Sequence, residues 1–228
     1  MQIRFSNAVA EQFRRAQPFP HVVLDGLFDA ALLAQVEREF PPVVGFPWTI
    51  MQNEWEYKLA NETPQNWGNT TRSVLRYLNS DPFVSELEKL TGLVGLISDP
   101  TFRGGGLHQI PPGGYLKIHT DFKEHNGVFL GKGWNRRLNL LIFLNSDWAE
   151  SWGGEFEMWS RDGREPVSKV VPLFNRTVIF ETSDQSFHGH PHPLRCPPTR
   201  TRKSLALYYY SKGKPSFVSS TRTRFVRS

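Results

Sequence analysis

The sequence predicts an α+β fold, mainly β, in which N-terminal helices pack against a C-terminal β-barrel. Signals for helices are confined to residues 1–100, whereas residues 101–228 are typical of short strands with no helix between them. Aromatic residues make up 13% of the chain, and they favour strands and line small-molecule pockets. A chain of 228 residues is long enough for one such domain with a substantial core.

Two helices are expected in the first half. Asp29 can cap a helix over Ala30–Phe40, whose apolar residues share one face before two prolines end it. A second helix is expected over Pro82–Leu90, with Asp81 as its cap, proline in its first turn and Gly92 as its stop.

Loops and strands account for most of the rest. The stretch Phe46–Thr71 is rich in Trp, Asn and Pro, and we interpret it as an irregular, lid-like segment over a pocket. Gly104–Gly106 predicts a flexible turn, because it lacks the Gly-Lys-Ser/Thr ending and the following helix of a phosphate loop. Apolar segments between turn residues then predict six strands. These are Tyr115–His119, Arg137–Asn145, Phe156–Trp159, Val167–Val171, Thr177–Glu181 and Ser204–Tyr210.

Composition narrows the class of protein. The single cysteine, Cys196, excludes an internal disulfide and a cysteine-rich zinc site. The N-terminus has no apolar core of signal-peptide length, and no apolar run reaches the length of a membrane span. We therefore expect a cytoplasmic protein that does not associate with membranes.

The net charge of +5 is unevenly distributed along the chain. Residues 185–228 contain nine Lys and Arg and no acidic residue, whereas residues 1–184 carry 18 basic and 22 acidic residues. Such a basic end is typical of nucleic-acid binding, but no nucleic-acid-binding motif accompanies it. We expect instead a solvated C-terminal end, with one or two arginines that hold an anionic ligand.

His119 and Asp121 are the first candidates for chemistry. Residues two apart on a strand project from the same face, so their imidazole and carboxylate can bind one metal ion. A hydrogen-bonded surface pair is the alternative. The later segment Ser186–His192 contains His188, His190 and His192, any of which can supply a third ligand. Two histidines and one carboxylate on one face of an octahedron form the triad of non-haem Fe(II) oxygenases.

A basic strand follows the histidine cluster. The three open positions of such a triad suit a 2-oxo acid and O₂, and a 2-oxo dicarboxylic acid needs a cation for its far carboxylate. Arg202 opens the strand that continues into Ser204, and strand alternation places both residues on one face. Arg200 and Lys203 are the competing cations, and Lys203 is expected to point the other way.

The order of these motifs resembles a known family. His-x-Asp, Gly153–Phe156, Ser-Phe-His-Gly and Arg-Lys-Ser-Leu together are similar to the 2-oxoglutarate- and Fe(II)-dependent oxygenases of the prolyl-4-hydroxylase-like group, over residues 101–211. The resemblance implies a double-stranded β-helix (jelly-roll) core and a single oxygenase domain over 1–228. Residues 1–100 would be its helical and lid support, and 212–228 a basic tail.

The resemblance also implies roles for individual residues. His119, Asp121 and His188 would bind Fe(II), and Arg202 with Ser204 would hold 2-oxoglutarate, with O₂ as co-reactant and ascorbate as a supporting reductant. Tyr115 lies near the position where relatives place a tyrosine over the cosubstrate. Halogenating relatives replace the carboxylate ligand with a small residue, so the presence of Asp121 favours hydroxylation, with release of succinate and CO₂.

The substrate side is less defined. Asn139 is expected to face the cosubstrate, and the candidate substrate contacts are His108, Trp134, Arg137 and His190. Arg136 and Arg137 together open the strand that contains Asn139, and either of them can contact an anionic or peptide substrate, with a surface position as the alternative. The substrate would be a small molecule or a peptide with a proline-like residue, and the sequence does not indicate an oligomeric state. Two other functions compete: a cupin-like barrel that binds a metal or sugar without oxidation, and a nucleic-acid-binding module that uses the basic end.

Overall fold

A computed structural model of the protein describes residues 2–122, 124, 133–212 and 223–226. Within these ranges there are four α-helices: α1 (Asn7–Arg15), α2 (Ala30–Arg38), α3 (Asn69–Leu78) and α4 (Asp81–Thr91). Two short 3₁₀ helices cover Pro64–Asn66 and Glu150–Trp152. The strands are β1 (His21–Asp25), β2 (Thr49–Gln52), β3 (Glu56–Asn61), β4 (Ile97–Ser98), β5 (Gly106–Ile110), β6 (Tyr115–Thr120), β7 (Trp134–Phe143), β8 (Phe156–Trp159), β9 (Pro166–Val170), β10 (Arg176–Glu181), β11 (His188–His190), β12 (Arg202–Lys212) and β13 (Arg224–Phe225).

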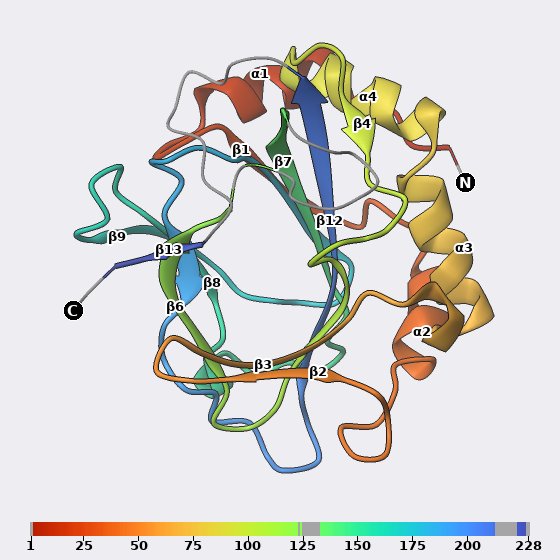
Figure 1. Cartoon of the computed structure of the whole chain (residues 1–228), viewed down its shortest axis with the longest axis vertical. Coiled ribbons are helices and arrows are strands. Elements are labelled where there is room, and N and C mark those ends of the chain that lie inside the picture. The colour runs from red at the N-terminus through yellow and green to blue at the C-terminus, as the bar shows by residue number, and fades with distance from the viewer. Residues whose placement is uncertain (1, 123, 125–132, 213–222, 227–228) are drawn as a thin grey trace.

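The strands curl into a nearly closed antiparallel barrel, with the helices along one side of it (Figure 1). The main strand order is β1-β10-β7-β12-β5-β3-β6-β11-β8-β9. Three short strands join this path at its sides: β13 pairs with β6, β2 with β3, and β4 with β12. This arrangement confirms the α+β, mainly β class with a jelly-roll core and N-terminal packing helices.

Alternation along the long strands separates the core from the site. On β7 and β12, Leu138, Leu140, Leu205 and Leu207 are at most 2% exposed and belong to the same apolar cluster as the buried faces of the helices. The intervening residues of both strands point into the barrel, and they include polar side chains. The helices therefore cover the outer face, and the inner face is left for chemistry.

Both expected helices are present, with adjusted ends. The Asp29 side chain accepts from the Leu32 amide at 2.7 Å and caps α2, as expected, although α2 ends at Arg38 rather than Phe40. In α4, Asp81 is the first helical residue and Ser80 occupies the cap position, so the assignment of Asp81 as cap was wrong. Gly92 ends α4 with φ of 78°, the left-handed conformation that favours glycine.

The expectation of an irregular segment over 46–71 was wrong. This stretch forms the hairpin β2-β3, and β3 pairs with both β5 and β6. Its final residues begin α3, which the sequence did not predict because Asn, Thr and Ser dominate its first half. Burial of Val74, Leu75 and Leu78 against the core stabilises α3 in spite of that composition.

All six expected strands are present, with ends no more than three residues from the predicted ones, as β6, β7, β8, β9, β10 and β12. Gly104–Gly106 forms a turn in which the Gly105 amide donates to Phe102 O, and Gly106 already begins β5. The strand β11 was not predicted, because two of its three residues are histidines. Of the basic end, residues 213–222 and 227–228 lie outside the described residues. None of the described helices has both the length and the apolarity that a membrane span requires.

Candidate active site

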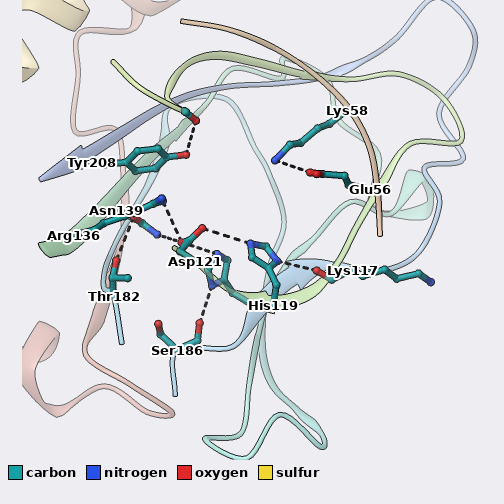
Figure 2. Close-up of polar contacts among 12 residues, drawn as sticks. Glu56, Lys58, Lys117, His119, Asp121, Arg136, Asn139, Thr182, Ser186 and Tyr208 are labelled. Carbon is teal, nitrogen blue, oxygen red and sulfur yellow. Dashed lines mark hydrogen bonds and ion pairs between the residues drawn. The ribbon is translucent and has the colours of Figure 1, made fainter. Parts of the chain in front are cut away.

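Three predicted ligands converge on the inner face of the barrel. His119 lies near the end of β6, Asp121 follows that strand directly, and His188 begins β11, which pairs with β6 so that His188 is opposite His119. One ligand atom from each residue lies within 4.8 Å of the others. His119 Nε2 is 3.6 Å from Asp121 Oδ1 (Figure 2). His188 Nε2 is 3.4 Å from Asp121 Oδ2.

Backbone carbonyls orient both imidazoles. The Nδ1 atom of His119 lies 2.8 Å from Lys117 O, and the Nδ1 atom of His188 lies 2.8 Å from Ser186 O. A carbonyl can only accept, so Nδ1 carries the proton in both rings and Nε2 keeps its lone pair. Both Nε2 atoms face Asp121, so the tautomers are those that a metal ion between the three residues requires.

Charge states in the site also suit a cation. Burial acts to raise the pKa of Asp121, but the positive charge of Arg136 and contacts with the two histidines outweigh it and hold the pKa well below its usual range. Burial lowers the pKa of His188 to about 4, against the opposing effect of Asp121. At neutral pH the structure therefore presents an ionised carboxylate beside a neutral imidazole, and the donor set fits a divalent metal such as Fe(II).

Asn139 and Arg136 both contact the carboxylate of Asp121 (Figure 2). Asn139 Nδ2 donates to Asp121 Oδ2 at 2.6 Å, and Arg136 Nη2 lies 3.1 Å from the same oxygen. Arg136 Nε donates to Asn139 Oδ1 at 2.6 Å, which joins the two supporting residues. The guanidinium carbon of Arg136 also lies over the rings of Tyr208 at 3.2 Å and Phe122 at 4.8 Å from their centroids.

Arg136 occupies the place expected for Arg137, and a β-bulge is the reason. Strict alternation from Asn139 would turn Arg137 inward, but the pairing of β7 with β12 shifts between Tyr209 and Tyr210, which leaves Arg137 as the extra residue. The Arg137 side chain lies outside the cavity, where Nη1 donates to Ser211 Oγ at 3.2 Å and Nη2 lies 3.5 Å from Glu181 Oε1. The assignment of Arg137 to the pocket is therefore corrected to Arg136.

Arg202 is a buried cation in the same cavity. It is 5% exposed, its Nε donates to Gly154 O at 2.7 Å, and its guanidinium lies 4.8 Å from the Phe143 ring centroid. Among the described residues it forms no ion pair with a carboxylate, and burial lowers its pKa to about 9. Ser204 lines the cavity beside it on the same face of β12. A buried, unpaired guanidinium fits the far carboxylate of a 2-oxo dicarboxylic acid.

Two further histidines line this inner cavity. Nε2 of His108 lies 3.0 Å from Gly104 O, and burial lowers the pKa of His108 to about 3. His190 is 4% exposed, and burial followed by the charge of Arg202 keeps its pKa well below the usual value. Both predicted histidines are therefore neutral residues of the cavity wall.

Two predicted residues are not brought into the cavity. The Tyr115 hydroxyl donates to Asn53 O at 2.8 Å, and Leu116 faces the cavity in its place. A β-bulge again explains the difference. His188 pairs with His119 and His190 pairs with Leu116, so a step of two residues along β11 lies opposite a step of three residues along β6. This shift turns Leu116 rather than Tyr115 toward the cavity. Trp134 lies at the start of β7, with the Lys212 ammonium 5.1 Å from its ring centroid, away from the metal ligands.

A second cavity, here called the outer cavity, also borders the metal ligands His119 and Asp121. Its volume is about 270 Å³, compared with about 70 Å³ for the inner one, so it is the roomier space beside the triad. Its lining includes the ion pair Lys58–Glu56 at 2.9 Å and the aromatic rings of Phe122, Tyr208 and Phe225. Phe225 comes from β13 near the end of the chain, and it had no signal in the sequence because only long-range pairing with β6 places it there.

Comparisons with known proteins agree with this site. Residues 105–210 match the family model of the 2OG-Fe(II) oxygenase superfamily, a segment that contains the triad and Arg202. A search of curated proteins found no match.

Solved structures resemble the chain in fold. A prolyl-4-hydroxylase from Pseudomonas putida superimposes with a TM-score of 0.64 at 16% identity, covering 90% of this chain and 98% of that one. A Trichoplax adhaerens prolyl hydroxylase in complex with a hypoxia-inducible-factor peptide gives 0.63 at 16% identity, covering 90% and 88%. HygX from Streptomyces hygroscopicus, with nickel, 2-oxoglutarate and hygromycin B bound, gives 0.53 at 13% identity, covering 95% and 90%.

The matched segment, the shared barrel and the convergent ligand set lead to one assignment. Residues 105–210 match a 2OG-Fe(II) oxygenase domain, and this match, the prolyl-4-hydroxylase-like fold and the triad His119–Asp121–His188 support a 2-oxoglutarate-dependent Fe(II) dioxygenase.

Proposed function

We propose that this protein hydroxylates a C–H bond of a small-molecule or peptidyl, proline-like substrate, with conversion of 2-oxoglutarate and O₂ to succinate and CO₂. One observation carries the proposal: the ligand atoms of His119, Asp121 and His188 converge beside a cavity that also holds the unpaired guanidinium of Arg202. Burying an unpaired charge is unfavourable, and a metal-binding barrel without a cosubstrate has no anion to compensate it. The arrangement therefore favours the oxygenase over the non-oxidative alternative.

The three ligands would hold Fe(II) through the two Nε2 atoms and one carboxylate oxygen. Bound Fe(II) with 2-oxoglutarate supplies the oxidising chemistry when O₂ is present. The part of this chain is to present the imidazoles in the correct tautomer, and to keep Asp121 ionised through Arg136 and Asn139. We assign Asn139 to this supporting role rather than to direct contact with the cosubstrate.

The inner cavity would hold the cosubstrate. Arg202 provides a charged, bidentate partner for the far carboxylate, and Ser204 provides a hydroxyl donor on the same strand face. Gly154 fixes the Arg202 side chain by accepting from its Nε, which leaves the outer nitrogens of the fork for the carboxylate. The wall also contains apolar side chains, among them the buried Phe156 and Phe180, which limit the access of water to the reacting atoms.

The outer cavity would hold the substrate. Its larger volume lies directly against His119 and Asp121, so a C–H bond placed there would face the metal. The structural neighbours include proteins bound to a peptide and to hygromycin B. The mixed lining of aromatic rings and the Glu56–Lys58 pair is compatible with either class, and we keep both in the proposal.

Anaerobic spectroscopy tests the proposal. Addition of 2-oxoglutarate to the Fe(II)-loaded protein should produce the visible metal-to-ligand charge-transfer band of a chelated 2-oxo acid, and exposure to O₂ should then yield succinate. Arg202→Met should raise the 2-oxoglutarate concentration needed by about 100-fold, whereas Arg200→Met, two residues earlier on the chain, should leave it unchanged. Iron-loaded, folded protein that gives no band would favour the metal- or sugar-binding barrel instead.

A further inference from the structure

His190 is a buried histidine whose ring nitrogens lack partners. It is 4% exposed, and neither Nδ1 nor Nε2 has a hydrogen-bond partner among the residues that the structure describes. The other histidines of the two cavities differ, because His108, His119 and His188 each have a ring nitrogen within 3.0 Å of a backbone carbonyl oxygen. Among the described histidines of the cavities, His190 is therefore the one whose ring nitrogens are both available to hydrogen-bond a bound ligand.

The position of His190 indicates which kind of ligand its ring nitrogens would bind. It lies two residues after His188 on β11, so both side chains point into the barrel from one strand, and His190 lines the inner cavity with Arg202 and Ser204. Of the charged groups that lower the pKa of His190, Arg202 has the largest effect. The inner cavity thus contains an unpaired guanidinium, a hydroxyl and an unpaired imidazole, and an imidazole can donate to an anion that a guanidinium holds.

We propose that His190 is a cosubstrate-binding residue, in which a ring N–H donates a hydrogen bond to the 2-oxoglutarate carboxylate that Arg202 holds. The inference rests on the proposed function, and it deepens it by adding a contact from β11 to those from β12. A buried polar group without a partner is unfavourable, so the free site is arranged for a polar occupant rather than for an apolar one. The same bond would connect the cosubstrate to the strand that carries a metal ligand.

The test compares two 2-oxo acids that differ at one end. Fe(II)-loaded protein is titrated without oxygen, with 2-oxoglutarate and with 2-oxopentanoate, which chelates iron equally but has no far carboxylate, and the charge-transfer band reports binding. The variants are His190→Leu, His190→Gln, which keeps an N–H donor, and Arg202→Met. His192→Leu is the matched control, because His192 is an exposed histidine two residues further along the chain.

We expect His190→Leu to weaken 2-oxoglutarate binding roughly 10- to 100-fold, the range for a buried hydrogen bond to a charged group. Binding of 2-oxopentanoate and of Fe(II) should change less than two-fold, His190→Gln should recover most of the loss, and His192→Leu should match wild type. Equal losses for both 2-oxo acids, or none for either, would overturn the assignment. A wild-type protein that gives no band would instead refute the proposed function itself.

A measurement on the wild-type chain covers the case in which the variants fail to fold. With ¹⁵N-labelled histidine and Zn(II) in place of iron, the His190 ring nitrogens should shift on addition of 2-oxoglutarate and not of 2-oxopentanoate. A shift of the same size with both acids would show that His190 contacts an ordered water or the shared end of the ligand. That result would also overturn the inference.

Discussion

Asn139 Nδ2 donates to Asp121 Oδ2 at 2.6 Å, and Arg136 Nη2 lies 3.1 Å from the same oxygen. Because both donors address Oδ2, the carboxylate is held in one orientation by β7, a strand that carries none of the three predicted metal ligands. Asp121 Oδ1 is directed toward His119 Nε2 at 3.6 Å. The ligand set is therefore oriented by the protein itself rather than gathered by the metal.

Loss of the Asn139 amide should weaken the metal site. In Asn139→Leu, Asp121 loses its shortest hydrogen bond, and we expect metal affinity to fall by about 10- to 100-fold, as is typical when a partner of a metal ligand is removed. Chelator competition with Fe(II) or Ni(II) measures this change. Thr182→Val is the control, because the Thr182 hydroxyl, which among the described residues donates to Asn139 Oδ1 at 3.4 Å, does not contact Asp121 there, and its loss should change affinity less than about three-fold. Equal affinities for wild type and Asn139→Leu would contradict the supporting role.

The neighbouring arginines form a matched pair. Arg136→Met removes a buried cation that contacts Asp121, so we expect metal affinity to fall at least about ten-fold and the protein to be destabilised by about 3 kcal/mol. Arg137→Met removes a partly exposed pair with Glu181 and should cost about 1 kcal/mol or less, with metal affinity unchanged. Urea unfolding measures the loss of stability of both variants, and metal titration measures their metal affinity. A larger loss of metal affinity in Arg137→Met than in Arg136→Met would refute the assignment of Arg136 to the cavity.

The sequence located these site residues because the two-residue alternation of a β-strand holds for the two pairs to which it was applied. His119 and Asp121 do share a face, as do Arg202 and Ser204, and the four motifs in order indicated the family. The expected roles of Tyr115, which came from the resemblance, and of Arg137 did not hold, and in both cases pairing with the neighbouring strand shifts register. A bulge depends on two strands at once, so one strand's sequence does not reveal it.

Other features depend on contacts between distant parts of the chain. The hairpin β2-β3 forms because β3 fills the gap between β5 and β6, not because its sequence alternates. Phe225 reaches the outer cavity through pairing with His119, more than one hundred residues earlier, and its ring stacks on Trp55 at 5.2 Å between centroids. Local propensity carries no information about such pairs.

Glu39 provides a stability prediction outside the site. Burial acts to raise its pKa, but hydrogen bonds from the amides of Thr70 and Thr71 and from the Thr71 hydroxyl outweigh that effect and lower the pKa to about 2. The carboxylate thereby caps α3, whose own cap residue Gly68 has no side chain to do so. A lowered folded-state pKa stabilises the protein above about pH 4.5, and that contribution is lost as the pH falls through about 2.

Glu39→Gln should therefore lower the free energy of unfolding by about 1 kcal/mol at pH 7, a value that allows for solvent screening at this partly exposed side chain. The difference from wild type should shrink as the pH falls below 4.5, because the protonated wild-type side chain then resembles glutamine. Denaturant unfolding across this pH range measures the effect. A difference that stays constant with pH would show that the charge of Glu39 contributes nothing.

Gly154 should prove essential for cosubstrate binding, although its neighbourhood has the appearance of a simple turn. Its carbonyl accepts from Arg202 Nε at 2.7 Å, and a Cβ at this position would lie 3.0 Å from Arg202 Cδ and 2.5 Å from Leu194 Cδ2. Gly154→Ala would therefore displace the guanidinium, and we expect 2-oxoglutarate affinity to fall at least about ten-fold while metal affinity is retained.

Gly113→Ala separates that displacement from backbone strain. Both glycines have φ of 78°, so alanine costs each of them about 1 kcal/mol of conformational strain, but a Cβ at Gly113 meets no atom within 4 Å. Both variants should lose stability in thermal unfolding, Gly154→Ala more than Gly113→Ala because its Cβ also meets Leu194, and only Gly154→Ala should lose cosubstrate affinity in the anaerobic titration. If both lost affinity equally, strain rather than the position of Arg202 would be responsible, and the proposed role of Arg202 as the carboxylate partner would lose this support.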